Sequence, residues 1–239
     1  MRGDAVRERD RGADAAGRDV RIHRSVSVIE LSTGAEMRLT GDGPIAVVCV
    51  NGGQASEVEG TWSASLEWLA ARLAPRFHGL AFAEVRYRIK SWRQLDYCIA
   101  DARAAVREVG AERTLMLGFS MGGAVAISVC DEPSVEGVLG LAPWLPEKLP
   151  LEPIRGKRLD VLHGSLDRYL PGIPGVSPTL SRRGFDRALA VGATGTYSLI
   201  PGAVHGVALR SPWGRPVRLP RAAEWERRIV ARLGQFEAR

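Results

Sequence analysis

A serine, an aspartate and a histidine of this chain are placed for nucleophilic chemistry. Ser120, Asp167 and His205 each follow an apolar run that is typical of a β-strand. A serine hydroxyl is a weak nucleophile unless a base removes its proton as it attacks, and an imidazole, with an unperturbed pKa of ~6.5, suits that role. A carboxylate that holds the imidazole in one tautomer completes the set. We therefore expect Ser120 to be the nucleophile, His205 the base and Asp167 the acid that orients His205.

The residues around Ser120 are typical of a sharp turn between a strand and a helix. The pattern Gly-x-Ser-x-Gly runs from Gly118 to Gly122, after an apolar run and before a helix-like run rich in Ala and Val. The residues that flank the serine in such a turn must be nearly free of side chain, and glycine meets that demand. The pattern predicts that Ser120 stands clear of the backbone.

Strand-like and helix-like segments alternate along most of the chain. Besides the run before Gly118, we expect strands over 45–50, 79–85, 135–141, 159–162 and 195–200. Besides the helix after the elbow, we expect helices over 63–73, 94–109, 181–191 and 222–236. Partial alternation over 20–31 and 35–39, around Thr33-Gly34, indicates an antiparallel hairpin at a sheet edge. The pattern predicts an α/β fold, with a mostly parallel central sheet and helices on both faces.

The chain length of 239 residues suits one large domain. Residues 1–20, rich in Arg, Asp, Gly and Ala, have almost no large apolar side chains and predict a disordered tail. We expect residues 21–239 to form a single domain. Only 167 − 120 = 47 residues separate the serine from the acid, so at most a short lid, stiffened by prolines, is expected at 143–158.

Composition argues against several classes of protein. The net charge is +6, but Arg is spread along the chain among acidic residues, so we expect no nucleic-acid partner. The three cysteines are far apart and are expected to be free thiols in a reducing compartment. Zinc-type spacing, a secretory signal and an apolar run long enough to cross a membrane are all absent from the sequence. We therefore expect a cytoplasmic protein without a membrane span.

Four motifs together resemble the α/β-hydrolase superfamily, over roughly residues 22–236. They are Asn51-Gly52-Gly53, Gly118-Phe119-Ser120-Met121-Gly122, His163-Gly164-Ser165-Leu166-Asp167 and Pro201-Gly202-Ala203-Val204-His205-Gly206. The order Ser, acid, His is also that of this superfamily. One departure is Asn51, where many relatives carry His. The resemblance implies a serine hydrolase that cleaves a carboxylic ester or thioester through an acyl-enzyme intermediate, with no cofactor and no metal.

The same resemblance implies an oxyanion hole made of main-chain N–H groups. The expected donors are Met121, directly after the nucleophile, and either Gly53 or Gln54 after the early strand. Glu147, which follows the expected strand over 135–141, is the alternative to Asp167 as the acid. Alternative functions are acyl transfer or peptide cleavage with the same triad, and a noncatalytic binding protein that kept the fold.

Expectations about substrate recognition rest on position alone. Trp144, Leu145 and Tyr169, together with Met121, are expected to line a modest apolar pocket near Ser120. Three arginines also fall near the same edge of the sheet, namely Arg86, Arg88 and Arg168. They could favour an acidic substrate or simply face solvent, and we expect them to face solvent. The sequence leaves the oligomeric state open.

Overall fold

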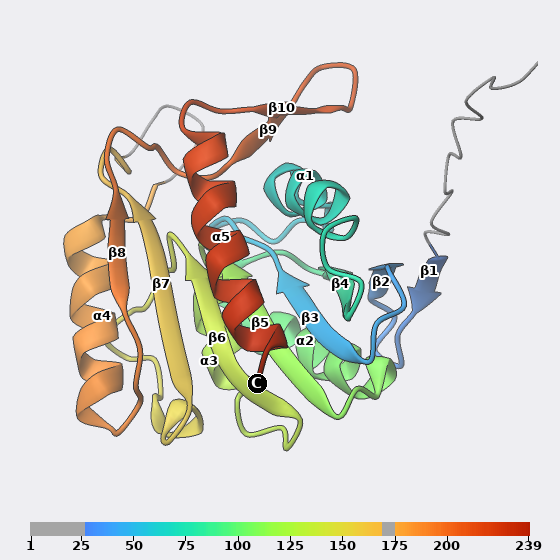
Figure 1. The fold of residues 1–239 in the computed structure, drawn as a ribbon, viewed down its shortest axis with the longest axis horizontal. Helices are drawn as coiled ribbons and strands as arrows, with labels where there is room; N and C mark the ends of the chain where they lie inside the picture. Colours follow the sequence, from blue (N-terminus) through green and yellow to red (C-terminus); the bar gives the residue numbers. More distant parts are fainter. Residues whose placement is uncertain (1–26, 169–174) are drawn as a thin grey trace, which may run out of the picture.

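A single twisted sheet of eight strands organises the chain (Figure 1). The computed structural model describes residues 27–168 and 175–239; the expected tail at 1–20 and Tyr169 lie outside the described residues. The strands of this sheet are β1 (Ser27–Glu30), β2 (Glu36–Thr40), β3 (Ile45–Val50), β4 (Leu80–Arg86), β5 (Arg113–Phe119), β6 (Val135–Leu141), β7 (Arg158–Gly164) and β8 (Tyr197–Ile200). Two further strands, β9 (Ala208–Arg210) and β10 (Pro216–Arg218), form a separate small sheet. The helices are α1 (Ala64–Leu73), α2 (Leu95–Val109), α3 (Gly122–Ser128), α4 (Pro178–Ala190) and α5 (Ala222–Glu237), with short 3-10 turns η1 (Trp92–Gln94) and η2 (Glu152–Ile154).

The strand order is β1-β2-β4-β3-β5-β6-β7-β8. From β3 onward all neighbours in this sheet are parallel, and β1 and β2 form the antiparallel hairpin at one edge. The predicted mostly parallel sheet and its edge hairpin are therefore confirmed. After β3 the chain adds β4 on one side and β5 on the other, so the order reverses at β3 and β5. Ligand sites in open α/β sheets lie outside the carboxyl ends of strands at such a point.

Alternating apolar side chains of the parallel strands feed two separate cores. In β3, Val47 and Cys49 point to the face covered by α1 and α5, whereas Val48 and Val50 point to the face covered by α2, α3 and α4. Full burial of a side chain of this size contributes about 1.5–3 kcal/mol. A sheet buried on both faces explains why these strands read as unbroken apolar runs.

The helices begin and end where local chemistry predicts. The Ser63 hydroxyl accepts a hydrogen bond from the Leu66 N–H (3.3 Å) and caps the start of α1. Gly110 ends α2 in the left-handed conformation, at φ +61°. The predicted helices over 63–73, 94–109, 181–191 and 222–236 match α1, α2, α4 and α5 to within three residues at each end.

One element was not predicted, the small antiparallel hairpin of β9 and β10. Its strands pair Ala208 with Arg218 and Arg210 with Pro216, and the hairpin lies beside α1 (Figure 1). The expected free thiols are confirmed, since Cys49, Cys98 and Cys130 are all unpaired and buried. Burial raises the pKa of the Cys130 thiol to about 12, so this thiol is not reactive at neutral pH.

Candidate active site

Ser120 lies in a strained turn between β5 and α3. Its φ is +55°, and only two other non-glycine residues in the described part of the chain have positive φ. A residue in this region costs about 1–3 kcal/mol and persists only where its surroundings hold it. Here the Ser120 N–H donates to Leu141 O (3.0 Å), and the Ser120 carbonyl accepts from the N–H groups of Gly123 (2.9 Å) and Trp144 (2.8 Å).

Two of the flanking glycines are required by close backbone contact. A Cβ on Gly118 would lie 2.4 Å from Gly122 O, and a Cβ on Gly122 would lie 2.2 Å from Val50 O. Neither backbone oxygen has room to move. The Gly-x-Ser-x-Gly pattern is thus the sequence consequence of packing the turn directly against the end of β3.

Asp167 and His205 form a buried pair at the same edge of the sheet. His205 Nδ1 lies 2.7 Å from Asp167 Oδ2, and the Asp167 side chain is fully buried. Asp167 Oδ1 accepts a hydrogen bond from the Val176 N–H (3.0 Å), and His163 Nε2 lies 3.1 Å from Oδ2. Burial alone raises the pKa of Asp167, but the hydrogen bonds from His163 and His205 outweigh it and hold that pKa below its ordinary value.

The loop that carries His205 is held by a buried serine of α1. Ser65 Oγ accepts hydrogen bonds from the N–H groups of Val207 (3.0 Å) and Ala208 (3.1 Å) and donates to Ala208 O (3.0 Å). The ring of Phe119 lies 5.0 Å from the His205 ring, centroid to centroid. Ser65 therefore holds the main chain after His205, and Phe119 packs against the imidazole.

Two of the residues expected to supply oxyanion donors are in contact. A Cβ on Gly53 would lie 2.3 Å from Met121 Sδ, so the loop after β3 packs against the side chain of the residue that follows Ser120. Gln54 forms an isolated bridge with Ser91, and its carbonyl accepts from the Trp92 N–H (3.1 Å).

Asn51, which stands where many relatives of the resembled superfamily carry His, braces this loop. Its side-chain oxygen accepts from the Gly52 N–H (2.7 Å), and its amide donates to Thr61 O (3.1 Å). The Tyr87 hydroxyl donates to the Asn51 carbonyl (3.2 Å). These bonds keep the main chain of the loop in place.

Two pockets open at Ser120. The first, here called the His205 pocket, has a volume of about 260 Å³ and is lined by Asn51, Gly52, Gly53, Gln54, Thr61, Trp62, Ser63, Ala64, Ser65, Lys90, Phe119, Ser120, His205, Ala208, Leu209 and Arg210. The second, here called the tryptophan pocket, has a volume of about 300 Å³ and is lined by Trp92, Ser120, Met121, Trp144, Gly175 and Val176. Ser120 is the residue common to both.

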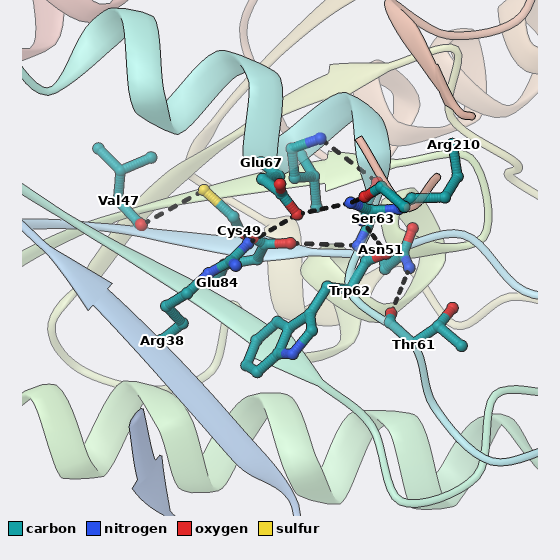
Figure 2. A network of polar contacts seen from close by, with 12 residues as sticks. Arg38, Val47, Cys49, Asn51, Thr61, Trp62, Ser63, Glu67, Glu84 and Arg210 are labelled. Carbon is teal, nitrogen blue, oxygen red and sulfur yellow. Dashed lines mark hydrogen bonds and ion pairs between the residues drawn. The ribbon is translucent and has the colours of Figure 1, made fainter. Parts of the chain in front are cut away.

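Ion pairs fix one wall of the His205 pocket (Figure 2). Buried Glu84 pairs with Arg38 (2.5 Å) and accepts from the Ser63 N–H (3.1 Å). Burial raises the pKa of Glu84, against the opposing effect of Arg38. Glu67 binds Arg210 Nη1 (2.9 Å) and also lies 3.4 Å from Arg38. The side chains therefore tie α1 to both the sheet and the β9–β10 hairpin.

The structure separates several of the other expected residues from Ser120. Glu147 is exposed and lies with Leu145 in a third cavity, beside α4, which shares Trp144 and Val176 with the tryptophan pocket, whereas His205 pairs with Asp167. Trp144 lies at the tryptophan pocket, as expected from position. Leu145 is buried in the core on the α4 side.

Of the three arginines expected to face solvent, two are half-buried and engaged in ion pairs. Arg86 pairs with Glu36 (2.6 Å) and Glu59, and Arg88 pairs with the buried Asp101 (2.8 Å). Only Arg168 is exposed as expected.

Sequence reasoning missed three residues that the structure brings to this edge. His163 was given no role of its own within its motif, but it lies in β7, is fully buried and contacts Asp167. Ser65 and Lys90 had no motif around them. A signal for His163 was available, because it stands four residues before Asp167 in the same motif.

Two general properties follow from the described residues. Within 27–168 and 175–239, no group of three or more His, Cys, Asp or Glu side chains is arranged to hold a metal ion. In the same residues, every helix is too short or too polar to span a bilayer.

Comparison with known proteins agrees on the architecture. No protein-family model matches the sequence, and no curated protein matches it. Among solved structures, MGS-M1, an α/β-hydrolase enzyme from a Medee basin deep-sea metagenome library, has a TM-score of 0.64 and 16% identity, covering 90% of this chain and 100% of that one. A hormone-sensitive lipase from a metagenome library has a TM-score of 0.63 and 15% identity, covering 89% and 84%. The monoacylglycerol lipase of Paleococcus ferrophilus has a TM-score of 0.59 and 17% identity, covering 83% and 98%. The chain therefore has the α/β-hydrolase fold.

Proposed function

We propose that this protein is a serine hydrolase that cleaves a carboxylic ester or thioester through an acyl-enzyme intermediate. In this proposal Ser120 is the nucleophile, His205 the general base and Asp167 the carboxylate that orients His205. The main-chain N–H groups of Met121 and Gly53 stabilise the oxyanion. Gly53 is preferred to Gln54 because Gln54 is bridged to Ser91.

The observation that carries the proposal is the buried Asp167–His205 pair, at 2.7 Å, beside a serine held at positive φ. Ser120 and His205 line the same pocket, which supports His205 as the base that takes the hydroxyl proton. Two proteins of similar fold are named as lipases, which supports an ester as the substrate class.

The reaction follows from these positions. Oγ of Ser120 attacks the carbonyl carbon as its proton passes to Nε2 of His205, and the carbonyl oxygen becomes an oxyanion. Collapse of the tetrahedral intermediate breaks the bond to the leaving group, which takes the proton from His205. Water then attacks the acyl-enzyme with the same base, releasing the carboxylic acid and restoring Ser120. Loss of one oxyanion donor costs roughly 10²–10³ in rate in such enzymes.

Covalent labelling tests the proposal directly. Wild type, Ser120→Ala and Ser134→Ala are each treated with a fluorophosphonate probe and weighed intact by mass spectrometry. Ser134 is the matched control, because it lies where the chain enters β6, at the opposite edge of the sheet. We expect one adduct on wild type and Ser134→Ala, and none on Ser120→Ala.

The two outcomes distinguish an active serine enzyme from a noncatalytic binding protein. A single Ser120-dependent adduct is followed by ester and thioester assays, with an added alcohol or amine acceptor to distinguish hydrolysis from acyl transfer. The absence of an adduct on wild-type protein, shown to be folded by its thermal unfolding, would refute an activated serine and favour a noncatalytic binding protein.

A further inference from the structure

The two pockets at Ser120 receive different parts of a substrate. In the proposed reaction His205 must give its proton to the leaving group, so the leaving group has to lie beside the imidazole. Of the two pockets, the His205 pocket contains His205 and the tryptophan pocket does not. The leaving group therefore belongs in the His205 pocket, and the acyl group belongs between Trp92 and Trp144.

The walls of the two pockets differ in charge. The tryptophan pocket is lined by Trp, Met, Val and Gly, apart from Ser120 itself, and suits an apolar acyl group. The His205 pocket carries two cationic side chains, Lys90 and Arg210, and no Asp or Glu among its described lining residues. Arg210 is neutralised by its ion pair with Glu67 (2.9 Å) and donates to Trp62 O and Gly214 O.

Lys90 is the cation that is left without a counter-charge. Its ammonium donates to Thr61 Oγ1 (2.8 Å). Among the described residues, no carboxylate oxygen lies within 4.0 Å of it. An ammonium has three donors, so two remain after the bond to Thr61. Lys90 is half-buried, and this partial burial lowers the pKa of its ammonium.

The backbone of Lys90 is fixed before any substrate arrives. Its N–H donates to Val58 O (2.8 Å), and its neighbour Ser91 bridges to Gln54, in the loop over Ser120. The side chain therefore starts from a rigid point at the rim of the pocket. A fixed, partly desolvated ammonium favours a bound anion more than a solvent-exposed lysine does.

We propose that the leaving group of the substrate is an alcohol or thiol that carries an anionic group, a carboxylate or a phosphate, and that Lys90 binds this anion. This inference rests on the proposed function. It makes Lys90 a specificity-determining residue and defines the substrate class as an apolar acyl ester or thioester of an anionic alcohol or thiol.

Matched thioesters test the inference. The butanoyl thioesters of mercaptoacetate, of its neutral analogue mercaptoacetamide and of mercaptoethyl phosphate share one acyl group and differ in the charge of the leaving thiol. The kcat/KM for thiol release is measured for wild type, Lys90→Gln, Lys90→Arg and the control Arg239→Gln. Arg239 is the matched control because it is an exposed cation at the opposite edge of the sheet, near the marked C-terminus in Figure 1.

Wild type should prefer the mercaptoacetate thioester to the mercaptoacetamide thioester by on the order of tenfold in kcat/KM. Lys90→Gln should bring this ratio close to unity with little change for the amide. Lys90→Arg and Arg239→Gln should keep the preference. The kcat/KM of the phosphate thioester relative to the carboxylate thioester identifies which anion the pocket fits better.

Failure of this inference is distinguishable from failure of the proposed function. Ser120-dependent cleavage of all three thioesters at similar kcat/KM would overturn the role of Lys90 and leave the hydrolase intact. An anionic preference that persists in Lys90→Gln would do the same. No Ser120-dependent cleavage of any ester or thioester, together with no fluorophosphonate adduct, would overturn both.

Discussion

His163 lies against the same carboxylate oxygen of Asp167 that binds His205. Nε2 of His163 is 3.1 Å from Oδ2 of Asp167 and 3.0 Å from the Val176 carbonyl oxygen. Because both neighbours are acceptors, Nε2 is the nitrogen that carries the hydrogen. The other nitrogen, Nδ1, is buried without a hydrogen-bond partner among the described residues. His163 therefore stabilises the ionised form of Asp167 and acts on the candidate active site through that carboxylate.

Replacement of His163 should move the acid side of the pH–rate profile. Without this hydrogen bond, the effect of burial is less fully offset and the pKa of Asp167 rises from its lowered value. Asp167 orients His205 only when ionised, so its protonation adds a further loss of activity as pH falls through that pKa, and in His163→Leu this further loss should begin at higher pH. The measurement is kcat/KM against pH for wild type and His163→Leu.

His163→Gln is the matched control, because its amide can still donate to Asp167. It should keep an acid side closer to that of wild type. Superimposable acid sides for wild type and His163→Leu would show that His163 only fills space in the core.

The identity of the acid can be tested by comparing Asp167→Asn with Glu147→Gln. Asp167 is buried against His205, whereas Glu147 is exposed beside α4. We expect Asp167→Asn to lower kcat by ~10³ or more, because the amide no longer sets the tautomer of His205. Glu147→Gln should leave kcat within about twofold, by the ordinary neutrality of surface substitutions. The reverse ranking would move the acid to the loop after β6.

Much of the fold was predictable because the strands are buried on both faces. A continuous apolar run such as Ile45–Val50 is stable as a strand only in the interior of a sheet that helices cover on both faces. In this sequence such runs alternate with helical patterns. The positions of Ser120, Asp167 and His205 after the parallel strands β5, β7 and β8 then place them at one edge. The strands β9 and β10 have three residues each, and β10 begins with a proline, so neither is long enough to show a period of two, and the hairpin was missed.

The positioning residues were missed for a different reason. Ser65 lies more than 140 residues before the loop that it binds, and no local pattern links the two. Likewise, the pairing of Arg88 with Asp101 depends on the packing of α2 against β4. Sequence periodicity identifies which residues are buried, whereas polar partners far apart in the chain are fixed only by the folded geometry.

Ser65→Ala should weaken both stability and catalysis. The substitution leaves the buried N–H groups of Val207 and Ala208 without their acceptor, at a cost of about 1–3 kcal/mol. Because these amides follow His205 directly, kcat should fall by ~10-fold or more, while KM changes little. Urea denaturation and steady-state kinetics measure the two effects.

Ser134→Ala serves as the control for Ser65→Ala, since it removes a partly buried hydroxyl at the opposite edge of the sheet. It should leave kcat unchanged. If Ser65→Ala lost stability but kept full kcat, the His205 loop would hold its position without Ser65.

Two glycines of the site should respond in opposite ways to alanine. At Gly122 a Cβ would lie 2.2 Å from Val50 O, a backbone atom that cannot move without displacing the end of β3. Gly122→Ala should therefore disrupt the turn and lower the free energy of unfolding by about 3 kcal/mol or more. At Gly53 a Cβ would meet the end of the Met121 side chain, at 2.3 Å from Sδ and 2.7 Å from Cε. Methionine is flexible, and Gly53→Ala should therefore cost little stability, about 1 kcal/mol or less.

Activity separates a structural role of Gly53 from a role in the oxyanion hole. Alanine keeps the main-chain N–H, but displacement of the Met121 side chain shifts the loop against Ser120, and an oxyanion hole tolerates only small displacements of its donors. Gly53→Ala should accordingly lower kcat by ~10-fold or more with near-normal thermal unfolding. A Gly53→Ala variant with wild-type kcat would show that Gly53 is not the second oxyanion donor. Gln54 would then be the candidate donor, and the test would be whether loss of its bridge to Ser91 alters the rate.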